Sequence, residues 1–300
     1  MKRVLTGALC AATVAMLGAA LPAHAQSADT LSKISSSGKM TFAYRESSVP
    51  FSYLEGPEKP IGFAVDISNA IADAVRKQTG KSNLTVGWQA VTSANRIPLL
   101  QNGTIDLECG STTNNSARGK DVDFAINHFY TGTRLLVKKS SGIKNYADLK
   151  GKTVAITTGT TNMQVVRRYN EEKGLGINIV STKDHADAAL LVEADRAAAF
   201  AMDDILLFGL KANAKDPASL EVVGDSLQVE PYACMIRKND PKFKALVDGV
   251  ITGMMKSGEF EKLYNKWFMQ PIPPRNQSIG LPMSKELQDN IKAPSDKPAT

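Results

Sequence analysis

Short apolar segments typical of strands alternate with amphipathic helical patterns along most of this chain, and this alternation constrains the fold most. Ile67, Ile71 and Val75 recur at helical spacing. They mark one face of a helix over Asp66–Gln78, which Gly80 ends. Strands are expected at Met40–Tyr44, Leu84–Val91, Ile105–Cys109, Phe129–Lys138, Thr153–Thr157, Ile177–Ser181, Ala197–Met202 and Tyr232–Arg237. Further helices are expected at Asn95–Gln101, Thr161–Lys173, Asp184–Glu193, Ile205–Ala212 and Ser284–Ile291, with two more in Asp240–Trp267 that break near Gly258. The pattern predicts an α/β fold.

The N-terminal segment has the layout of a secretory signal peptide. Met1-Lys2-Arg3 is a basic start, the stretch from Val4 to Leu21 is uncharged, and Pro22-Ala23-His24-Ala25 ends in an A-x-A cleavage pattern. An uncleaved membrane anchor is the alternative, but the stretch only just reaches the ~18 residues of a span and is rich in Ala and Gly. We therefore expect export and cleavage after Ala25, which leaves 275 of the 300 residues.

Cleavage also changes the charge balance. The whole chain has 36 Lys and Arg against 30 Asp and Glu, a net charge of +6 that could suggest a polyanionic partner. Lys2 and Arg3 leave with the signal peptide, so 34 basic residues face 30 acidic ones. The remaining chain has no basic block and no basic stripe interleaved with aromatic residues. Nucleic-acid binding is therefore not expected.

Two cysteines, Cys109 and Cys234, remain after cleavage removes Cys10. An even count in an exported chain favours one disulfide, and two buried thiols are the alternative. A bond between them would join segments 125 positions apart. The chain would then leave a domain after Cys109 and return to it before Cys234.

Motifs for catalysis are missing from the sequence. His128 and His185 are the histidines of the mature chain, and neither has the spacing of a metal ligand pair. The sequence has no G-x-S-x-G elbow, no Walker loop and no G-x-G-x-x-G after a strand. We expect no metal site, no cofactor and no enzymatic activity.

Arginines instead lie beside small hydroxyl residues at strand ends and helix starts. The segments are Tyr44-Arg45-Glu46-Ser47-Ser48, Ser93-Ala94-Asn95-Arg96, Gly110-Ser111-Thr112-Thr113-Asn114-Asn115 with Arg118 soon after, and Gly159-Thr160-Thr161. Free backbone N–H groups at such positions favour anions, and a guanidinium matches a carboxylate. Each segment alone also fits a surface arginine or an ordinary cap or turn. Their recurrence favours a site for a carboxylate ligand.

These segments carry a family resemblance that extends over essentially the whole mature chain. The matching runs are Arg45-Glu46-Ser47-Ser48-Val49-Pro50-Phe51-Ser52, Asn95-Arg96-Ile97-Pro98-Leu99-Leu100-Gln101-Asn102-Gly103, Glu108-Cys109-Gly110-Ser111-Thr112-Thr113-Asn114-Asn115, Gly159-Thr160-Thr161, Met202-Asp203-Asp204 and Lys266-Trp267-Phe268. On these runs the chain resembles the periplasmic glutamate/aspartate-binding proteins, the solute-binding components of amino-acid ABC transporters.

The resemblance implies a two-lobed periplasmic-binding-protein fold of type 2, with two crossover strands at the hinge and the ligand in the cleft between the lobes. Residues 1–25 would be the signal peptide. Lobe 1 would comprise residues 26–131 and 230–300, and lobe 2 would comprise residues 132–229. Both cysteines then fall in lobe 1, near the hinge.

The resemblance also assigns the ligand-binding residues. Arg118, Ser111, Thr113 and Thr161 would hold the α-carboxylate, and either Thr160 or Thr161 would make the contact from lobe 2. Asp203 would pair with the α-ammonium. The side-chain carboxylate would be surrounded by Arg45, Ser93, Arg96 and His185. Glutamine, which is neutral at its side chain, would leave buried guanidinium groups unpaired.

The resemblance implies periplasmic capture of L-glutamate and L-aspartate by a monomer that closes around its ligand and delivers it to an inner-membrane ABC permease. One alternative is an enzyme on the same fold, such as a cyclohexadienyl dehydratase. Another is a binding protein for a different amino acid. Arg45 and Arg96 at the side-chain end disfavour neutral ligands.

Overall fold

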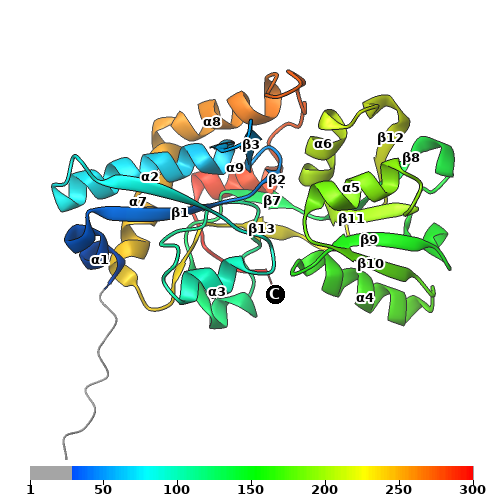
Figure 1. Ribbon diagram of the computed structural model, residues 1–300, viewed down its shortest axis with the longest axis horizontal. Helices are drawn as coiled ribbons and strands as arrows, with labels where there is room; N and C mark the ends of the chain where they lie inside the picture. Colours follow the sequence, from blue (N-terminus) through cyan, green and yellow to red (C-terminus); the bar gives the residue numbers. More distant parts are fainter. Residues whose placement is uncertain (1–28, 300) are drawn as a thin grey trace, which may run out of the picture.

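The computed structural model describes residues 29–299. The signal peptide and the cleavage site after Ala25 lie outside the described residues. Within the described part, no helix has both the length and the apolar character that crossing a membrane requires. Figure 1 shows two lobes side by side, joined by extended segments.

The smaller lobe contains a five-stranded sheet in the order β10-β9-β11-β8-β12. Its strands are β8 (Thr133–Lys138), β9 (Thr153–Thr157), β10 (Asn178–Thr182), β11 (Ala199–Asp203) and β12 (Leu220–Val223). β9 runs parallel to β10 and β11, whereas β8 is antiparallel to β11 and β12. The helices of this lobe are α4 (Thr161–Lys173), α5 (His185–Glu193) and α6 (Asp204–Asn213). This mixed α/β sheet agrees with the predicted fold class.

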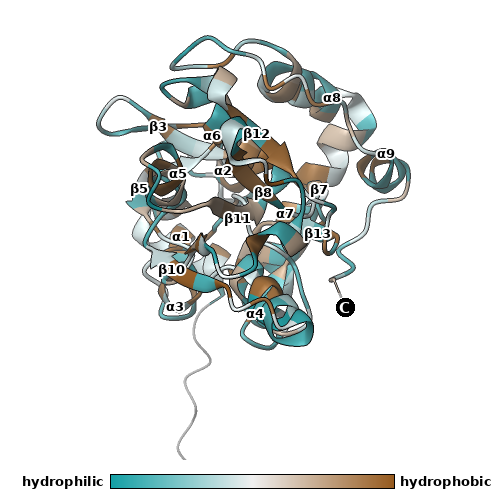
Figure 2. Cartoon of the chain, turned by 90° about the vertical axis from the view of Figure 1, so that its right-hand side faces the viewer, coloured by the Kyte–Doolittle hydropathy of each residue, from teal (hydrophilic) through white to brown (hydrophobic). Residues whose placement is uncertain are grey.

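Alternation along β9 explains how helices cover both faces of this sheet. Val154 and Ile156 pack in one hydrophobic cluster with Met163 of α4. Ala155 points to the other face and belongs to the cluster that contains Ala188 of α5 and the apolar side of α6. Figure 2 shows the hydrophobic strands of this lobe in brown inside the layer of helices.

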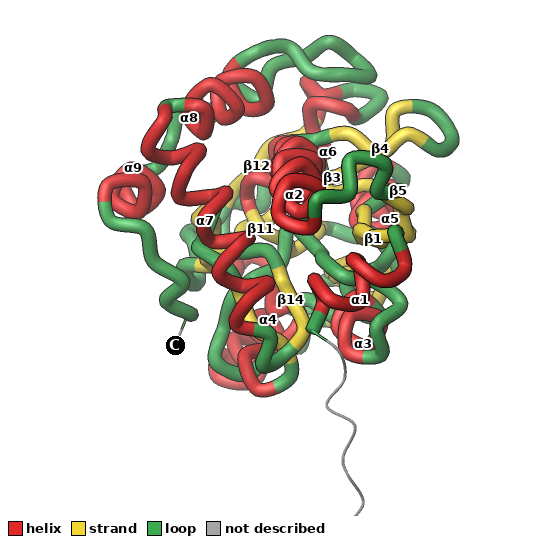
Figure 3. Tube along the Cα trace, turned by 90° about the vertical axis from the view of Figure 1, so that its left-hand side faces the viewer, coloured by secondary structure: helices red, strands yellow, loops and turns green. Residues whose placement is uncertain are grey.

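The larger lobe is built around β1 (Lys39–Tyr44), which pairs in parallel with β5 (Thr85–Ala90). Helices α1 (Thr30–Ser37), α2 (Phe63–Thr79) and α7 (Pro241–Ser257) lie together on its outer side, facing the viewer in Figure 3. The remaining elements are α3 (Arg96–Gln101), α8 (Glu259–Tyr264), α9 (Lys285–Lys292), and the antiparallel strands β2 (Ser47–Ser48), β3 (Ser52–Glu55) and β4 (Lys59–Ile61). Short helical turns are η1 (Arg118–Lys120), η2 (Lys139–Ser141), η3 (Tyr146–Leu149), η4 (Pro217–Ser219) and η5 (Asn265–Met269).

Two antiparallel strand pairs lie where the chain passes between the lobes. One pair contains the connecting strands, and the other continues it into the larger lobe. β7 (Phe129–Thr131) pairs with β13 (Glu230–Tyr232), and β6 (Val122–Phe124) pairs with β14 (Met235–Arg237). The chain enters the smaller lobe after β7 and returns through β13. The lobe boundaries 131/132 and 229/230 stay predictions.

The predicted extended run Phe129–Lys138 is two strands in two different sheets. Gly132 separates β7 from β8, and a larger residue does not fit there, since a Cβ atom would lie 1.8 Å from Oγ of Ser226. The predicted strand Ile105–Cys109 is also irregular. Leu107 bridges Phe42 on one side and Glu108 bridges Met235 on the other, so the segment forms no continuous ladder with either. The sequence pattern did not predict α1, β12 or the β2–β4 hairpins.

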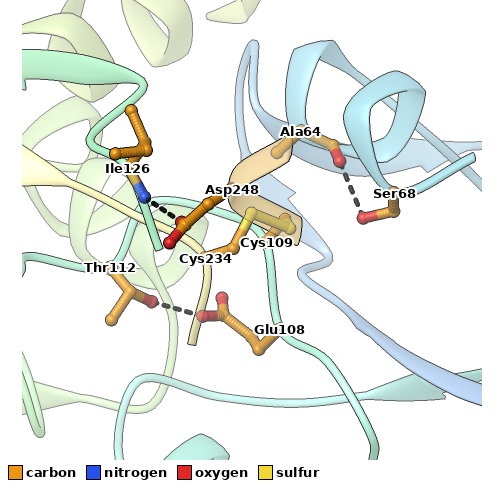
Figure 4. The surroundings of a disulfide bond; sticks show 8 residues. All are labelled: Ala64, Ser68, Glu108, Cys109, Thr112, Ile126, Cys234 and Asp248. Carbon is orange, nitrogen blue, oxygen red and sulfur yellow. Dashed lines mark hydrogen bonds between the residues drawn. A yellow bond between two sulfur atoms is a disulfide. The ribbon is translucent and has the colours of Figure 1, made fainter. Parts of the chain in front are cut away.

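The structure joins Cys109 and Cys234 in a disulfide, which confirms the predicted bond. Figure 4 shows the pair beside Glu108 and Ile126. Both cysteines are buried. Because Cys234 lies between β13 and β14, the bond ties the returning chain to the segment that follows Leu107.

Candidate functional site

A narrow cavity lies between the two lobes. Eight of the nine predicted ligand-binding residues line it. The full lining comprises Ser93, Arg96, Ser111, Thr113, Arg118, Thr160, Thr161, Asn162, His185, Met202 and Asp203. The ninth predicted residue, Arg45, lies behind His185, with its Nη2 3.2 Å from Nε2 of that histidine.

Strand ends and helix starts from both lobes position these side chains. Arg45 follows β1 and Arg96 begins α3 in the larger lobe, while Thr161 and His185 begin α4 and α5 in the smaller one. Asp203 ends β11. The carboxyl ends of strands in open α/β sheets are where ligands bind, so the local structure explains why these residues converge.

One end of the cavity is rich in unused hydrogen-bond donors. Arg45 and Arg96 are 0% and 2% exposed. Nη1 of Arg96 donates to the carbonyl of Ser111 at 3.3 Å. Within residues 29–299, however, Nε and Nη1 of Arg45, Nε of Arg96 and Oγ of Ser93 have no hydrogen-bond partner. Buried polar groups are normally paired, so this end is suited to an anionic acceptor.

His185 is neutral and holds Arg45 rather than offering a proton to the cavity. Burial, together with Arg45 nearby, lowers the pKa of His185 to about 3. Because a guanidinium only donates, Nε2 accepts from Arg45, and Nδ1 carries the proton toward Oγ1 of Thr157 at 2.9 Å. The side chain therefore positions the guanidinium.

The Arg96 end of the cavity is cationic although burial opposes charge there. Burial lowers the pKa of Arg96 to about 9, with a further lowering from Arg118, so the group stays charged at neutral pH. Asp184 lies 3.9 Å from Nη2 of Arg45. Burial alone would raise the pKa of Asp184, but the charge of Arg45 and the hydrogen bonds from the Ser47 hydroxyl and the His185 backbone N–H hold this pKa below its usual value.

The opposite end of the cavity combines one arginine with buried carboxylates. Nη1 of Arg118 donates to the carbonyl of Thr113 at 3.0 Å, and its Nη2 donates to the carbonyl of Gly159 in the other lobe at 3.2 Å. Asp203 accepts from Nδ2 of Asn162 at 2.8 Å and from the Tyr232 hydroxyl. Burial raises the pKa of Asp203 well above its usual value, and neighbouring Glu230 raises it further.

Thr160 and Thr161 both line the cavity, but their hydroxyls do different things. The Thr160 hydroxyl donates to the carbonyl of Thr157 and accepts from the Met163 N–H, so it caps α4. The Thr161 hydroxyl lies 3.4 Å from that of Thr113 and donates to Glu230. Thr161 is therefore the threonine that meets the other lobe.

Sequence reasoning missed one residue of the cavity wall, Asn162, and three residues that support the wall from behind. Glu230, Asn162, Tyr232 and Asp184 all contact predicted ligand-binding residues. No motif marks them: Asp184 opens the predicted helix Asp184–Glu193, and Glu230 lies just before the predicted strand Tyr232–Arg237. Among the residues that the structure describes, no group of three or more His, Cys, Asp or Glu is placed to hold a metal ion.

The lobes are closed around the cavity. The Ser47 hydroxyl of the larger lobe donates to Asp184, and the Ala186 N–H donates to Ser47 at 3.2 Å. Gly209 of α6 lies against the backbone of Val49, and a Cβ atom at this glycine would be 2.4 Å from that carbonyl oxygen. The closed arrangement therefore depends on a glycine at this contact.

Comparison with known proteins places this geometry among transport proteins. Residues 40–270 match the family described as bacterial extracellular solute-binding proteins, family 3. The chain is 50% identical over 268 residues to a glutamate/aspartate import solute-binding protein of Salmonella typhimurium, covering 89% of each chain. It is 46% identical over 298 residues to an L-glutamate/L-aspartate-binding protein of Pseudomonas aeruginosa, covering 99% of each. Among solved structures, a mutant arginine-binding protein of T. maritima has a TM-score of 0.72 at 28% identity, with 80% of this chain and 100% of that one covered.

Proposed function

The chain belongs to the family 3 bacterial extracellular solute-binding proteins, and on this premise we propose that it binds L-glutamate and L-aspartate between its lobes for import by an ABC transporter. Like its close relatives, it is a solute-binding protein and not an enzyme. The relatives' names supply the ligand class, and the site supplies an independent physical reason for it.

The observation that carries the proposal is the cluster of unpartnered donors at the Arg45–Arg96 end of the cavity. Within the described residues, Nε of Arg96 and Oγ of Ser93 lie on the cavity wall without hydrogen-bond partners. Nε and Nη1 of the buried Arg45, which lies behind His185, also have none. A side-chain carboxylate of glutamate or aspartate supplies two acceptor oxygens and the negative charge that these groups lack. A buried charge left unpaired costs about 2–5 kcal/mol, which is the basis for rejecting a neutral side chain.

The other end of the cavity fits the amino-acid head group. Arg118 and Ser111 line the cavity from the larger lobe, and we assign the α-carboxylate to them. Asp203 lines it on the side of the smaller lobe, where we assign the α-ammonium. The two ends together complement a dicarboxylate that carries one amine.

We assign a periplasmic location and a monomeric state to the mature protein, with cleavage after Ala25. Lobe closure would signal occupancy to an inner-membrane permease, because only the closed form brings the two lobe surfaces into their docking geometry. The contacts of Ser47 with Asp184 and of Gly209 with Val49 support a closed form of defined geometry.

Titration calorimetry on refolded, ligand-stripped protein tests the proposal. L-glutamate and L-aspartate are expected to bind with micromolar or tighter affinity, near −8.2 kcal/mol or better. L-glutamine and L-arginine serve as neutral and basic controls. Tight binding of either control, with no heat from the two acidic amino acids, contradicts the proposal.

A further inference from the structure

Glu230 is a buried carboxylate at the boundary between the lobes. It begins β13, one of the two strands that connect them, and it is 0% exposed. It is absent from the cavity wall, but it contacts two residues that form that wall, Thr113 of the larger lobe and Thr161 of the smaller lobe.

Three donors surround the two oxygens of Glu230. The hydroxyls of Thr113 and Thr161 both donate to Oε2, the second at 2.7 Å, and Nε2 of Gln228 donates to Oε1. This is the pattern of an ionised carboxylate, which can only accept hydrogen bonds. Both threonine hydroxyls therefore direct their protons toward Glu230.

The proton count decides what these hydroxyls offer a ligand. A hydroxyl has one proton and two lone pairs, so a hydroxyl that donates to Glu230 has only lone pairs left for the cavity. Thr113 and Thr161 then present acceptors. Hydroxyl oxygens that can only accept suit an ammonium group, which has only donors. A carboxylate placed there would be repelled, because its oxygens would face the lone pairs of the two hydroxyl oxygens.

The surrounding charges point the same way. Within residues 29–299, no Lys, Arg or His nitrogen lies within salt-bridge distance of Asp203 or Glu230. Oδ1 of Asn162, a fully buried residue of the cavity wall, also has no partner there. Two buried carboxylates and one unused acceptor are thus gathered with no cation in direct contact. Arg118 is the nearby cation, since Glu230 and Asp203 both act to raise its pKa, but its guanidinium donates to the carbonyls of Thr113 and Gly159 instead.

We propose that Glu230 orients the Thr113 and Thr161 hydroxyls as acceptors for the ligand's ammonium group and so makes this end of the cleft select for an amine. The proposal rests on the proposed function, and it differs from the expectation that these hydroxyls donate to the α-carboxylate. Glu230 is a positioning residue here, since it acts through the two threonines. Arg118 and Ser111 remain for the α-carboxylate.

The test compares L-glutamate with glutarate, which has the same two carboxylates and no amine. Calorimetry measures L-glutamate directly and glutarate by displacement of bound L-glutamate. In Glu230→Gln the side-chain amide can donate to a threonine hydroxyl, which then turns its proton to the cavity. We expect L-glutamate to bind more weakly and glutarate more tightly, so that the ratio of their affinities falls about tenfold or more.

Thr161→Val is the second variant, and it keeps the test decisive if Glu230→Gln does not fold. Loss of an acceptor should weaken L-glutamate about tenfold and leave glutarate within about twofold of its original affinity. Glu172→Gln, at an exposed site on α4, is the matched control and should change neither affinity.

The outcomes separate this inference from the proposed function. If the unchanged protein does not bind L-glutamate, the proposed function fails. If it binds L-glutamate but the affinity ratio is the same in Glu230→Gln, or glutarate binding stays undetectable in that variant, the role of Glu230 is overturned. Equal weakening of L-glutamate and glutarate in Thr161→Val also overturns the role of Glu230. That result would mean that the Thr161 hydroxyl donates to a carboxylate, which both ligands have, and does not accept from the ammonium group.

Discussion

Replacing Arg96 with alanine should remove much of the affinity for L-glutamate and leave the fold intact. The Arg96 guanidinium is 2% exposed, makes one hydrogen bond to the Ser111 carbonyl, and leaves Nε without a partner among the described residues. Under the proposed function, this group meets the side-chain carboxylate of the ligand.

The size of the effect follows from what remains at that end of the cavity. Truncating one partner of a buried, hydrogen-bonded charge pair costs about 2–5 kcal/mol. Arg45 is still present in the variant and is 0% exposed, so the ligand carboxylate keeps one cation. We therefore expect the lower part of the range, about 2–3 kcal/mol, which is roughly a 30- to 150-fold increase in Kd.

Titration calorimetry on the mature protein measures this change, with Arg275→Ala as the control at an exposed position. The control should bind L-glutamate within about twofold of the unchanged protein. L-glutamine has no side-chain carboxylate to lose, so Arg96→Ala should weaken its binding far less. Equal losses in the two variants, or equal losses for the two ligands, would refute the assignment of Arg96.

Three further changes test the closed state, the buried histidine and the disulfide. Gly209→Ala places a Cβ atom 2.4 Å from the Val49 carbonyl oxygen, so it should weaken L-glutamate binding about tenfold. The control Gly253→Ala, whose Cβ atom would have no atom within 4 Å, should leave binding unchanged. Equal affinities of the two variants by calorimetry would contradict a role for the Gly209–Val49 contact. Burial lowers the pKa of His128 to about 3, and its ring nitrogens have no partner among residues 29–299, so the folded state excludes a proton that the unfolded state binds below pH 6.5. The free energy of unfolding therefore has its full value from this group above pH 6.5 and falls by up to ~1.4 kcal/mol per pH unit as the pH drops toward 3. His128→Leu should flatten the pH dependence of urea unfolding in that window. Identical slopes in the two proteins would argue against this role of His128. Reduction of Cys109–Cys234, which spans 125 positions, should lower the free energy of unfolding by about 4–5 kcal/mol, and an unchanged denaturation midpoint would contradict that.

Local signals in the sequence were sufficient for several elements. Thr161–Lys173 was predicted with the bounds that α4 has, because Thr160 caps its start and Gly174 follows its end in the left-handed conformation. The break near Gly258 also appears, between α7 and α8. Caps and terminal glycines act within a few residues, so they can be read without the tertiary structure.

Long-range contacts could not be predicted in the same way. Glu230 is 117 positions from Thr113 and 69 from Thr161, and only the fold brings the three together. The irregular segment at Leu107 has the same origin, because it bonds to two different neighbours rather than to one strand. The orientation of His185 depends on Arg45, 140 positions away, which explains why its role as a support for the guanidinium was missed.

The orientation of the ligand in the cleft is the most direct test of how this site recognises an acidic amino acid. A crystal structure of the protein with L-glutamate measures it. We predict that the side-chain carboxylate lies within hydrogen-bond distance of Nε of Arg45 or Arg96, and that the ammonium group lies beside Asp203. A ligand bound in the reverse orientation, or outside the cavity lined by these residues, would contradict the assignment.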